Sequence, residues 1–357
     1  MSKGPATIRD VAKAAKVSAA TVSRHLNKSI VLPQETARRI DKACARLAYR
    51  PNALAKRLSL GSAQTIGLVA PEIANPFFAA LAAAAEAEAR RQGYSLLIMS
   101  TGGDPDIECE HIDRLGSRAV DGLLVLTSSA DDGRVRDQID GRPNVVLVDE
   151  DVPGASVSRI FVENEQGAYE ATRYLIDRGH AAIAHVGGPA GLLSSRERHA
   201  GFVRAMAEAG LSPLDSWVKF GGYDREAGLA AALDLLAQPQ RPTALFAGSD
   251  YIAIGVLQGL RQLGLEAPAA LSIVGFDDMP LAELLHPPLT TVRQPIAEMG
   301  RLGVQTLLAR MRGESPQPGE TRLPTQLVLR ASVASLVAAP QAAHRTRPRH
   351  KLKAKGV

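Results

Sequence analysis

The sequence predicts a small all-α head followed by a two-lobed α/β core built on parallel sheets. Two observations lead to this class. The first fifty residues hold short helical patterns and no strand pattern, whereas from residue 62 onward short apolar runs alternate with helical stretches of about ten to fifteen residues. With 357 residues, the chain is also long enough for two or three domains.

Charge is divided unevenly along the chain. Residues 1–61 contain 13 Lys and Arg against 3 Asp and Glu, and the last 17 residues contain 6 basic and no acidic groups. The residues between them hold 23 basic and 34 acidic groups. A basic head on an acidic body predicts that the head alone meets a polyanion.

The sequence also indicates the cellular compartment and whether a metal site is expected. No run of eighteen apolar residues is present, so no membrane-spanning helix is expected. The N-terminus MSKGPATIRD lacks the apolar segment of a signal peptide, which predicts a cytoplasmic protein. Cys44 and Cys109 are expected to stay free, and Cys109 with His111 supplies too few ligands for a metal site.

The first helix is predicted to begin after Thr7, which can form a capping box with Asp10. Its apolar residues share one face at helical spacing: Ile8, Val11, Ala12 and Ala15. A tight turn at Lys16 follows. Ser18 then caps a second helix, 19–26, and a third helix follows Pro33. The apolar residues expected to close this miniature core are Val22, Leu26, Ala37, Ile40, Cys44 and Leu47.

Two short helices joined by a brief turn, with a polar outer face, describe a helix-turn-helix. The second helix is expected to enter the major groove, where Arg24 can donate to guanine and Ala19 and Ala20 can touch thymine methyls. Short polar side chains suited to phosphate oxygens are Thr7, Thr21, Ser23 and Asn27. The alternative is an ordinary three-helix cap.

A short helix is predicted within YRPNALAKRLSLG, residues 49–61. Asn52 can cap it, and Leu54 and Leu58 share a face. Six residues cannot hold a helix alone in water, so a partner chain or DNA must fold it.

TIRDVAKAAKVSAATVSRHLN followed by YRPNALAKRL resembles the head and hinge helix of the LacI/GalR family of bacterial transcription regulators. The resemblance implies that Ala19, Ala20 and Arg24 select bases in operator DNA. It also implies that Leu58 enters the minor groove and that Leu54 meets its counterpart across a dimer axis, with Asn52 and Ala55 in the same hinge. Lys16 departs from the Gly or Asn that the family often has in the turn.

In the core, helices are expected over residues 78–92, 166–178, 196–209, 225–237 and 251–263. Nearly every strand between them ends in small polar residues: Ser100-Thr101, Thr127-Ser128, Asp149-Glu150, Glu163-Asn164, Ser249-Asp250 and Asp277-Asp278. Because ligands bind outside the carboxyl ends of parallel strands, these tips should surround a cleft. For any one tip, a solvated loop is the alternative.

The core also resembles this family, whose sugar-binding core is similar to the type I periplasmic sugar-binding proteins. NPFF, SSRERHAGF, FAGSD, SIVGFDD and HPPLTTVRQP carry that likeness. It implies an effector site formed by Phe77, Phe78, Asp149, Ser194, Arg198, Tyr223, Ser249 and Asp277. The domains implied are a head (1–50), a hinge helix (51–61), a two-lobed core (62–340) and a basic tail (341–357). Within the core, the N-lobe is 62–162 with 291–325, and the C-lobe is 163–290 with 326–340.

The interpretation that follows is a repressor of carbohydrate genes, active as a homodimer on palindromic operator DNA and controlled by a sugar or sugar acid. Arg198 offers a fork of donors to hydroxyls or a carboxylate, although it could instead pair with Glu197. GGDPD and HVGGPAG do not form a dinucleotide fingerprint, and no nucleophile motif is present, so neither a cofactor nor an enzyme is expected. His180 and His185 are expected to be cap and core residues. A transport-type sugar-binding protein and a sugar-modifying enzyme are the rival hypotheses.

The C-terminal tail is the last element. QAAHRTRPRHKLKAKGV has no apolar heptad, so a tetramerisation coiled coil is not expected there. A disordered basic tail is expected, with weak nonspecific contact to DNA as the alternative.

Overall fold

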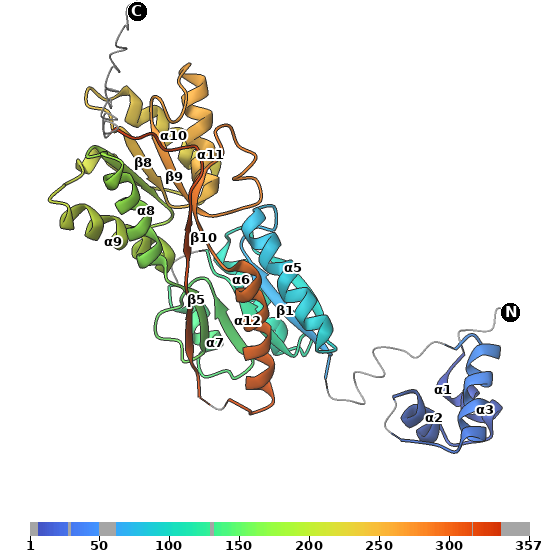
Figure 1. Ribbon diagram of the computed structural model, residues 1–357. Coiled ribbons are helices and arrows are strands. Elements are labelled where there is room, and N and C mark those ends of the chain that lie inside the picture. The colour runs from blue at the N-terminus through green and yellow to red at the C-terminus, as the bar shows by residue number, and fades with distance from the viewer. Residues whose placement is uncertain (1–5, 28–29, 50–61, 129–131, 316, 337–357) are drawn as a thin grey trace, which may run out of the picture.

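The computed structural model describes residues 6–27, 30–49, 62–128, 132–315 and 317–336. They form a three-helix head and a core of two six-stranded sheets, each flanked by helices (Figure 1). This is the predicted fold class. The hinge residues 51–61 and the tail 341–357 lie outside the described residues. No helix in the described part of the chain is long and apolar enough to cross a membrane.

The head consists of α1 (Ile8–Ala15), α2 (Ala19–Leu26) and α3 (Gln34–Arg46). Their core contains the expected Val11, Val22 and Ile40, all fully buried. On α3 the buried alanine is Ala43, whereas Ala37, which the spacing favoured, is only half-buried.

The first sheet runs in the order β11-β5-β4-β3-β1-β2, and all its pairings are parallel. Its strands are β1 (Thr65–Ala70), β2 (Ser95–Ser100), β3 (Gly122–Val125), β4 (Val145–Val148), β5 (Ser158–Val162) and β11 (Glu320–Leu323). Alternate residues point to opposite faces, so Leu124 packs under α5 (Pro76–Arg91) and α12 (Ile296–Met311), while Leu123 packs under α6 (Pro105–Ile112) and α7 (Arg134–Ile139). A short 3-10 helix, η1 (Asp113–Leu115), follows α6.

The second sheet runs in the order β12-β10-β9-β8-β6-β7. Its strands are β6 (Ile183–Gly187), β7 (Val218–Phe220), β8 (Ala244–Ala247), β9 (Ser272–Asp277), β10 (Thr290–Arg293) and the antiparallel β12 (Gln326–Val328). The helices α8 (Asn164–Asp177) and α9 (Leu193–Glu208) lie side by side, as do α10 (Arg225–Ala237) and α11 (Asp250–Gln262) (Figure 1). A 3-10 helix, η2 (Asp215–Trp217), precedes β7.

The chain passes from one sheet to the other three times: after β5, after β10 and after β11. The expected start of the second N-lobe segment at residue 291 is therefore wrong. Thr291 pairs with Gly275 and with Val328 inside the second sheet, so the crossover follows Arg293. Because parallel strands keep one polarity, the carboxyl ends of both sheets open toward the junction of the two lobes.

Candidate functional site

The turn of the head is held in a left-handed conformation. Lys16 has φ 53° and ψ 47°, a backbone geometry that costs a non-glycine residue roughly 1–2 kcal/mol. Arg39 on α3 stabilises it by donating to the carbonyl of Ala15 at 3.1 and 2.8 Å and to that of Lys16 at 3.3 Å. Arg39 was not predicted from the sequence, because its partners are backbone atoms more than twenty residues away.

Both helices of the motif have the predicted caps. Thr7 donates through its amide and its hydroxyl to Asp10 Oδ2 at 2.9 and 2.7 Å. Ser18 Oγ accepts from the amide of Thr21 at 3.0 Å and lies 2.8 Å from the Thr21 hydroxyl. The hydroxyls of Thr7 and Thr21 therefore lie at the two helix N-termini, where the dipole favours an anion.

The residues expected to read bases are not equally exposed. Ala20 and Arg24 lie one turn apart on α2 and are exposed, but Ala19 is half-buried and packs against the head's core. Ala19 therefore exposes only part of its methyl group, because the first turn of α2 packs on the core of the head. Ser23 and Asn27 are half-buried on the flank. The predicted hinge residues lie outside the described residues: Asn52, Leu54, Ala55 and Leu58.

In the core, all eight residues predicted for the effector site line one small cavity of about 30 Å³ between the lobes. Two further residues of its lining were missed by the sequence reasoning, Asn75 and Gln294. An adjoining cavity of about 460 Å³ shares Asn75, Phe78, Asp149 and Tyr223 with it. Strand-tip residues Thr127 and Ser128 also line this second cavity, as the rule for parallel sheets predicts.

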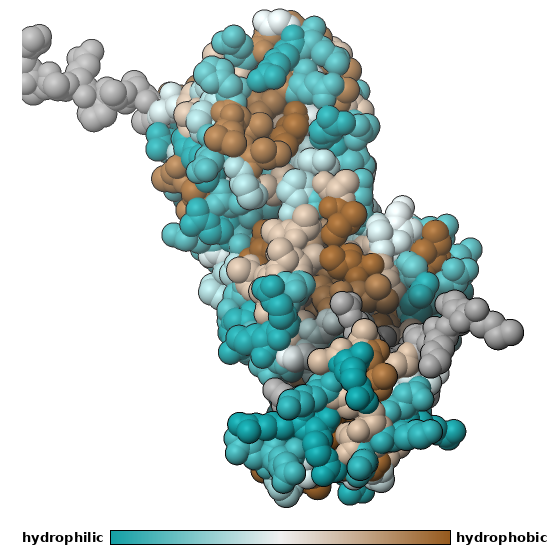
Figure 2. Space-filling model, turned by 90° about the vertical axis from the view of Figure 1, so that its right-hand side faces the viewer, coloured by the Kyte–Doolittle hydropathy of each residue, from teal (hydrophilic) through white to brown (hydrophobic). Residues whose placement is uncertain are grey.

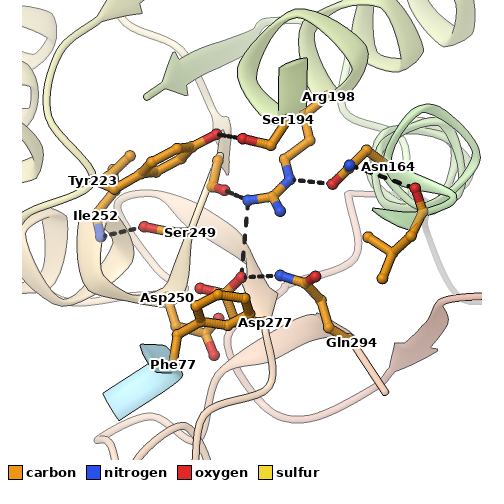
Figure 3. A network of polar contacts seen from close by, with 12 residues as sticks. Phe77, Asn164, Ser194, Arg198, Tyr223, Ser249, Asp250, Ile252, Asp277 and Gln294 are labelled. Carbon is orange, nitrogen blue, oxygen red and sulfur yellow. Dashed lines mark hydrogen bonds and ion pairs between the residues drawn. The ribbon is translucent and has the colours of Figure 1, made fainter. Parts of the chain in front are cut away.

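Arg198 on α9 lines this cavity and lies at the centre of a network of polar contacts (Figure 3). Its Nε donates to Asn164 Oδ1 at 2.8 Å, and its Nη1 donates to the carbonyl of Gly248 at 2.7 Å. Nη1 also lies 3.8 Å from Asp277 Oδ1, and the guanidinium lies 3.9 Å from the centre of the Phe276 ring. These contacts fix the orientation of the Arg198 guanidinium, and the residue is only 3% exposed.

Glu197, the alternative partner for Arg198, turns instead to the other lobe. Arg322 Nη2 on β11 lies 2.8 Å from Glu197 Oε1. Arg198 is thus free of the neighbouring acid and is held by Asn164, a residue that the sequence identified only as a strand tip.

Two carboxylates of the cavity have left-handed backbones: Asp149 with φ 72° and Asp277 with φ 117°. Such strain is concentrated at functional sites. Asp277 accepts from Gln294 Nε2 at 2.7 Å, whereas Asp149 Oδ1 and Gln294 Oε1 are buried without a hydrogen-bond partner among the described residues. Burial raises the pKa of Asp149 to about 6 and that of Asp277 to about 7, in both cases against the opposing effect of Arg198.

A third buried acid, Glu150, connects the lobes. Glu150 follows β4 and accepts from the amide of Ser194 on α9 at 3.2 Å and from the Ser194 hydroxyl. Tyr223 OH lies 2.8 Å from the same hydroxyl. Burial, and then the charge of Asp149, raises the pKa of Glu150 to about 8.

Other polar residues near the site serve the fold. Ser249 Oγ caps α11 by accepting from the amide of Ile252 at 3.1 Å, which leaves this predicted effector residue its O–H donor and one lone pair. The aromatic wall is formed by Phe77 and Phe78, whose rings meet edge to face with centroids 5.2 Å apart.

The two histidines weighed as catalysts are core residues, as expected. His185 is fully buried between Phe202 and Phe246, and burial lowers its pKa to about 3. His180 Nδ1 lies 3.0 Å from Thr243 Oγ1, and His180 Nε2 lies 3.2 Å from the carbonyl oxygen of Ala334.

Known proteins share both the sequence and the architecture of this chain. A model of bacterial regulatory proteins of the lacI family matches residues 7–52, and a model of a periplasmic binding protein-like domain matches residues 172–333. The PurR repressor of Vibrio campbellii is 35% identical over 93% of this chain and 99% of its own. This chain belongs to the lacI family. The ribose operon repressor of Haemophilus influenzae is 36% identical over the same shares of the two chains.

Solved structures agree with this membership. The lac repressor dimer bound to operator and the anti-inducer ONPF superposes on this lacI-family chain with a TM-score of 0.82, at 26% identity over 92% of this chain and 99% of the other. The regulator CelR in complex with cellobiose gives a TM-score of 0.70 at 30% identity over the same shares. The family resemblance stated from the sequence is thereby confirmed.

Proposed function

We propose that this protein is a transcriptional repressor whose affinity for a palindromic operator is set by a small, sugar-sized effector bound between its lobes. The observation that carries the proposal is the joining, in one chain, of a helix-turn-helix head to a buried polar cavity lined by residues of both lobes. Two relatives that match nearly the whole chain are named as the transcriptional repressor PurR and a ribose operon repressor.

Operator recognition is assigned to α2. Arg24 and Ala20 form the exposed strip that enters the major groove, where a guanidinium reads guanine bidentately and a methyl meets thymine. Ala19 is half-buried, and the exposed part of its methyl group adds to this base-reading surface. Thr7, Thr21, Ser23 and Asn27 anchor the head to phosphates, with the two helix N-termini adding their dipoles. Asn52, Leu54, Ala55 and Leu58 are proposed to fold as the hinge on DNA.

Effector control is assigned to the junction of the lobes. Phe77, Phe78 and Asp149 come from the first lobe, and Arg198, Tyr223 and Asp277 from the second, so a ligand here changes how the lobes meet. The bonds Glu150–Ser194 and Glu197–Arg322 cross the same junction. Coupling between two sites of one protein typically amounts to ~1–3 kcal/mol, enough to switch operator occupancy.

A two-fold homodimer is proposed to present two heads to two half-sites. Large exposed apolar side chains of the described core include Leu97 and Ile98 on the edge strand β2, and Leu281 and Leu284 before β10. Figure 2 shows apolar patches within the mostly hydrophilic surface of one face. Burying such residues against a second copy would remove them from water.

The test is operator selection from random duplexes with the purified protein, followed by binding assays with and without candidate sugars. A transport-type binding protein would bind sugar but select no duplex, and a sugar-modifying enzyme would turn its ligand over. Enrichment of a palindrome whose affinity responds to a sugar supports the repressor. Failure to enrich any sequence overturns it.

A further inference from the structure

We propose that the effector carries a positively charged amine, as an amino sugar does, and that Asp149 and Glu150 receive it. This inference rests on the proposed function, because it concerns the same cleft between the lobes. It goes further by stating the charge of the ligand, and it disfavours the sugar acid that Arg198 alone had suggested.

The first observation is the charge of the cavity walls. The two adjoining cavities are lined by five carboxylates: Glu72, Asp149, Glu150, Asp224 and Asp277. Among the described residues of these linings, Arg198 is the one side chain with a fixed positive charge. An anionic ligand would therefore meet an excess of like charge in a poorly solvated space.

The second observation concerns what Arg198 can still offer. Its Nε and Nη1 are bound to Asn164 and Gly248, and its charge lies nearest Asp277. Asp149 and Glu150, which line the larger cavity, form no ion pair among the described residues, although the charge of Arg198 acts on both.

The third observation is a set of unpartnered acceptors. Asp149 Oδ1 is buried and has no hydrogen-bond partner among the described residues, although the side chain is only 8% exposed and lines both cavities. Gln294 Oε1 and Ser128 Oγ are also buried without a hydrogen-bond partner among the described residues. A buried oxygen without a donor costs free energy, and an ammonium group supplies three donors and no acceptor.

Titration supports the same assignment. Burial raises the pKa values of Asp149 and Glu150 above their ordinary values, against the effect of Arg198, so Glu150 retains a proton near neutral pH. Asp277 and Tyr223 from the other lobe and Glu72 and Asp224 at the rim add no positive charge. An ammonium group would replace protons bound to this pair, so amine binding should release protons and should tighten as the pH rises from about 6 to about 8.

The experiment uses calorimetric titration of the full-length protein with matched pairs: hexosamines, aminated pentoses and amino polyols, each beside its neutral parent and the corresponding sugar acid. The expected order of affinity is amine, then neutral parent, then acid, with proton release in the first case. Asp149→Asn should weaken an amine about tenfold or more and its neutral parent less than about threefold, because asparagine keeps the shape and tolerates the same backbone. Asp215→Asn, an exposed acid away from the cavity, should change neither.

Each outcome is decisive. A neutral parent or an acid that binds as tightly as its amine overturns the inference and leaves a sugar-controlled repressor standing. An amine whose advantage survives both Asp149→Asn and Glu150→Gln overturns the assignment to this acid pair. Binding by no member of the panel overturns the inference, while operator selection tests the repressor independently.

Discussion

The carboxylate of Glu150, in one lobe, accepts hydrogen bonds from the amide and hydroxyl of Ser194, in the first turn of α9 in the other lobe. The N-cap residue of this sixteen-residue helix is Leu192, which has no side-chain acceptor. The cap that α9 lacks locally is thus supplied across the cleft. The junction of the lobes, rather than either lobe alone, satisfies this helix terminus.

The first prediction concerns pH. The pKa of Glu150 rises from 4.5 to about 8 on folding, so between these values the folded protein holds more protons than the unfolded chain. Its contribution to stability is complete below the unfolded value and is lost as the pH rises toward 8. Glu150→Gln should flatten this loss and leave the variant at least ~1 kcal/mol more stable than the parent at the alkaline end. Urea denaturation across that range measures it.

Glu110→Gln is the matched control, because Glu110 is exposed on α6. It should reproduce the parent's profile. Identical pH profiles for the parent and Glu150→Gln would show that Glu150 is not a buried, protonated acid.

The second prediction concerns base reading. Arg24→Ala should lower affinity for the selected operator by about 5- to 150-fold, the value of one bidentate contact with guanine, while affinity for a scrambled duplex falls far less. Fluorescence anisotropy on both duplexes measures the difference. Arg38→Ala, an exposed arginine on α3, should reduce both affinities by a similar small factor. Equal losses on the two duplexes for Arg24→Ala would assign Arg24 to the phosphates instead.

The third prediction concerns the effector cavity. Arg198→Ala removes the donors to Asn164 and Gly248 and the cation beside Asp277, so effector binding should become undetectable in a thermal-shift assay. Arg204 lies on the same helix, is paired with Glu165 and does not line the cavity, so Arg204→Ala should keep the full shift. Circular dichroism of both variants verifies the fold. A normal shift in Arg198→Ala would place the effector elsewhere.

The fourth prediction concerns the hinge. The family resemblance assigns Leu58 to the minor groove, and this residue lies outside the described part of the chain. Leu58→Ala should decrease operator bending, measured by energy transfer between dyes at the duplex ends, and should weaken specific binding. Bending equal to that of the parent would show that Leu58 does not enter the minor groove.

Much of this structure follows from local rules that a sequence displays. The capping box at Thr7, the cap at Ser18 and helix α10 all lie where periodicity and capping placed them. Helix α5 begins at Pro76, two residues before the expected start, because Asn75 caps it by accepting from the amide of Phe77.

The remaining features depend on contacts between distant segments. Strand β10 joins the second sheet through partners on β9 and β12, which no local pattern reveals. Gln294 lies in the crossover after β10 and donates to Asp277. Glu150 belongs to the first lobe and accepts from Ser194 of the second lobe. Helices α6, α7 and α12 were not anticipated, because their apolar faces form only against a sheet that is already assembled.

The most direct test of the central claim is the affinity of the purified protein for its selected operator, measured without effector and at saturating effector. We expect operator affinity to change by about 5- to 150-fold. Because coupling is reciprocal, effector affinity should change by the same factor when operator is saturating. Operator affinity that is identical in the two conditions, for an effector shown by calorimetry to occupy the Arg198 cavity, would contradict it.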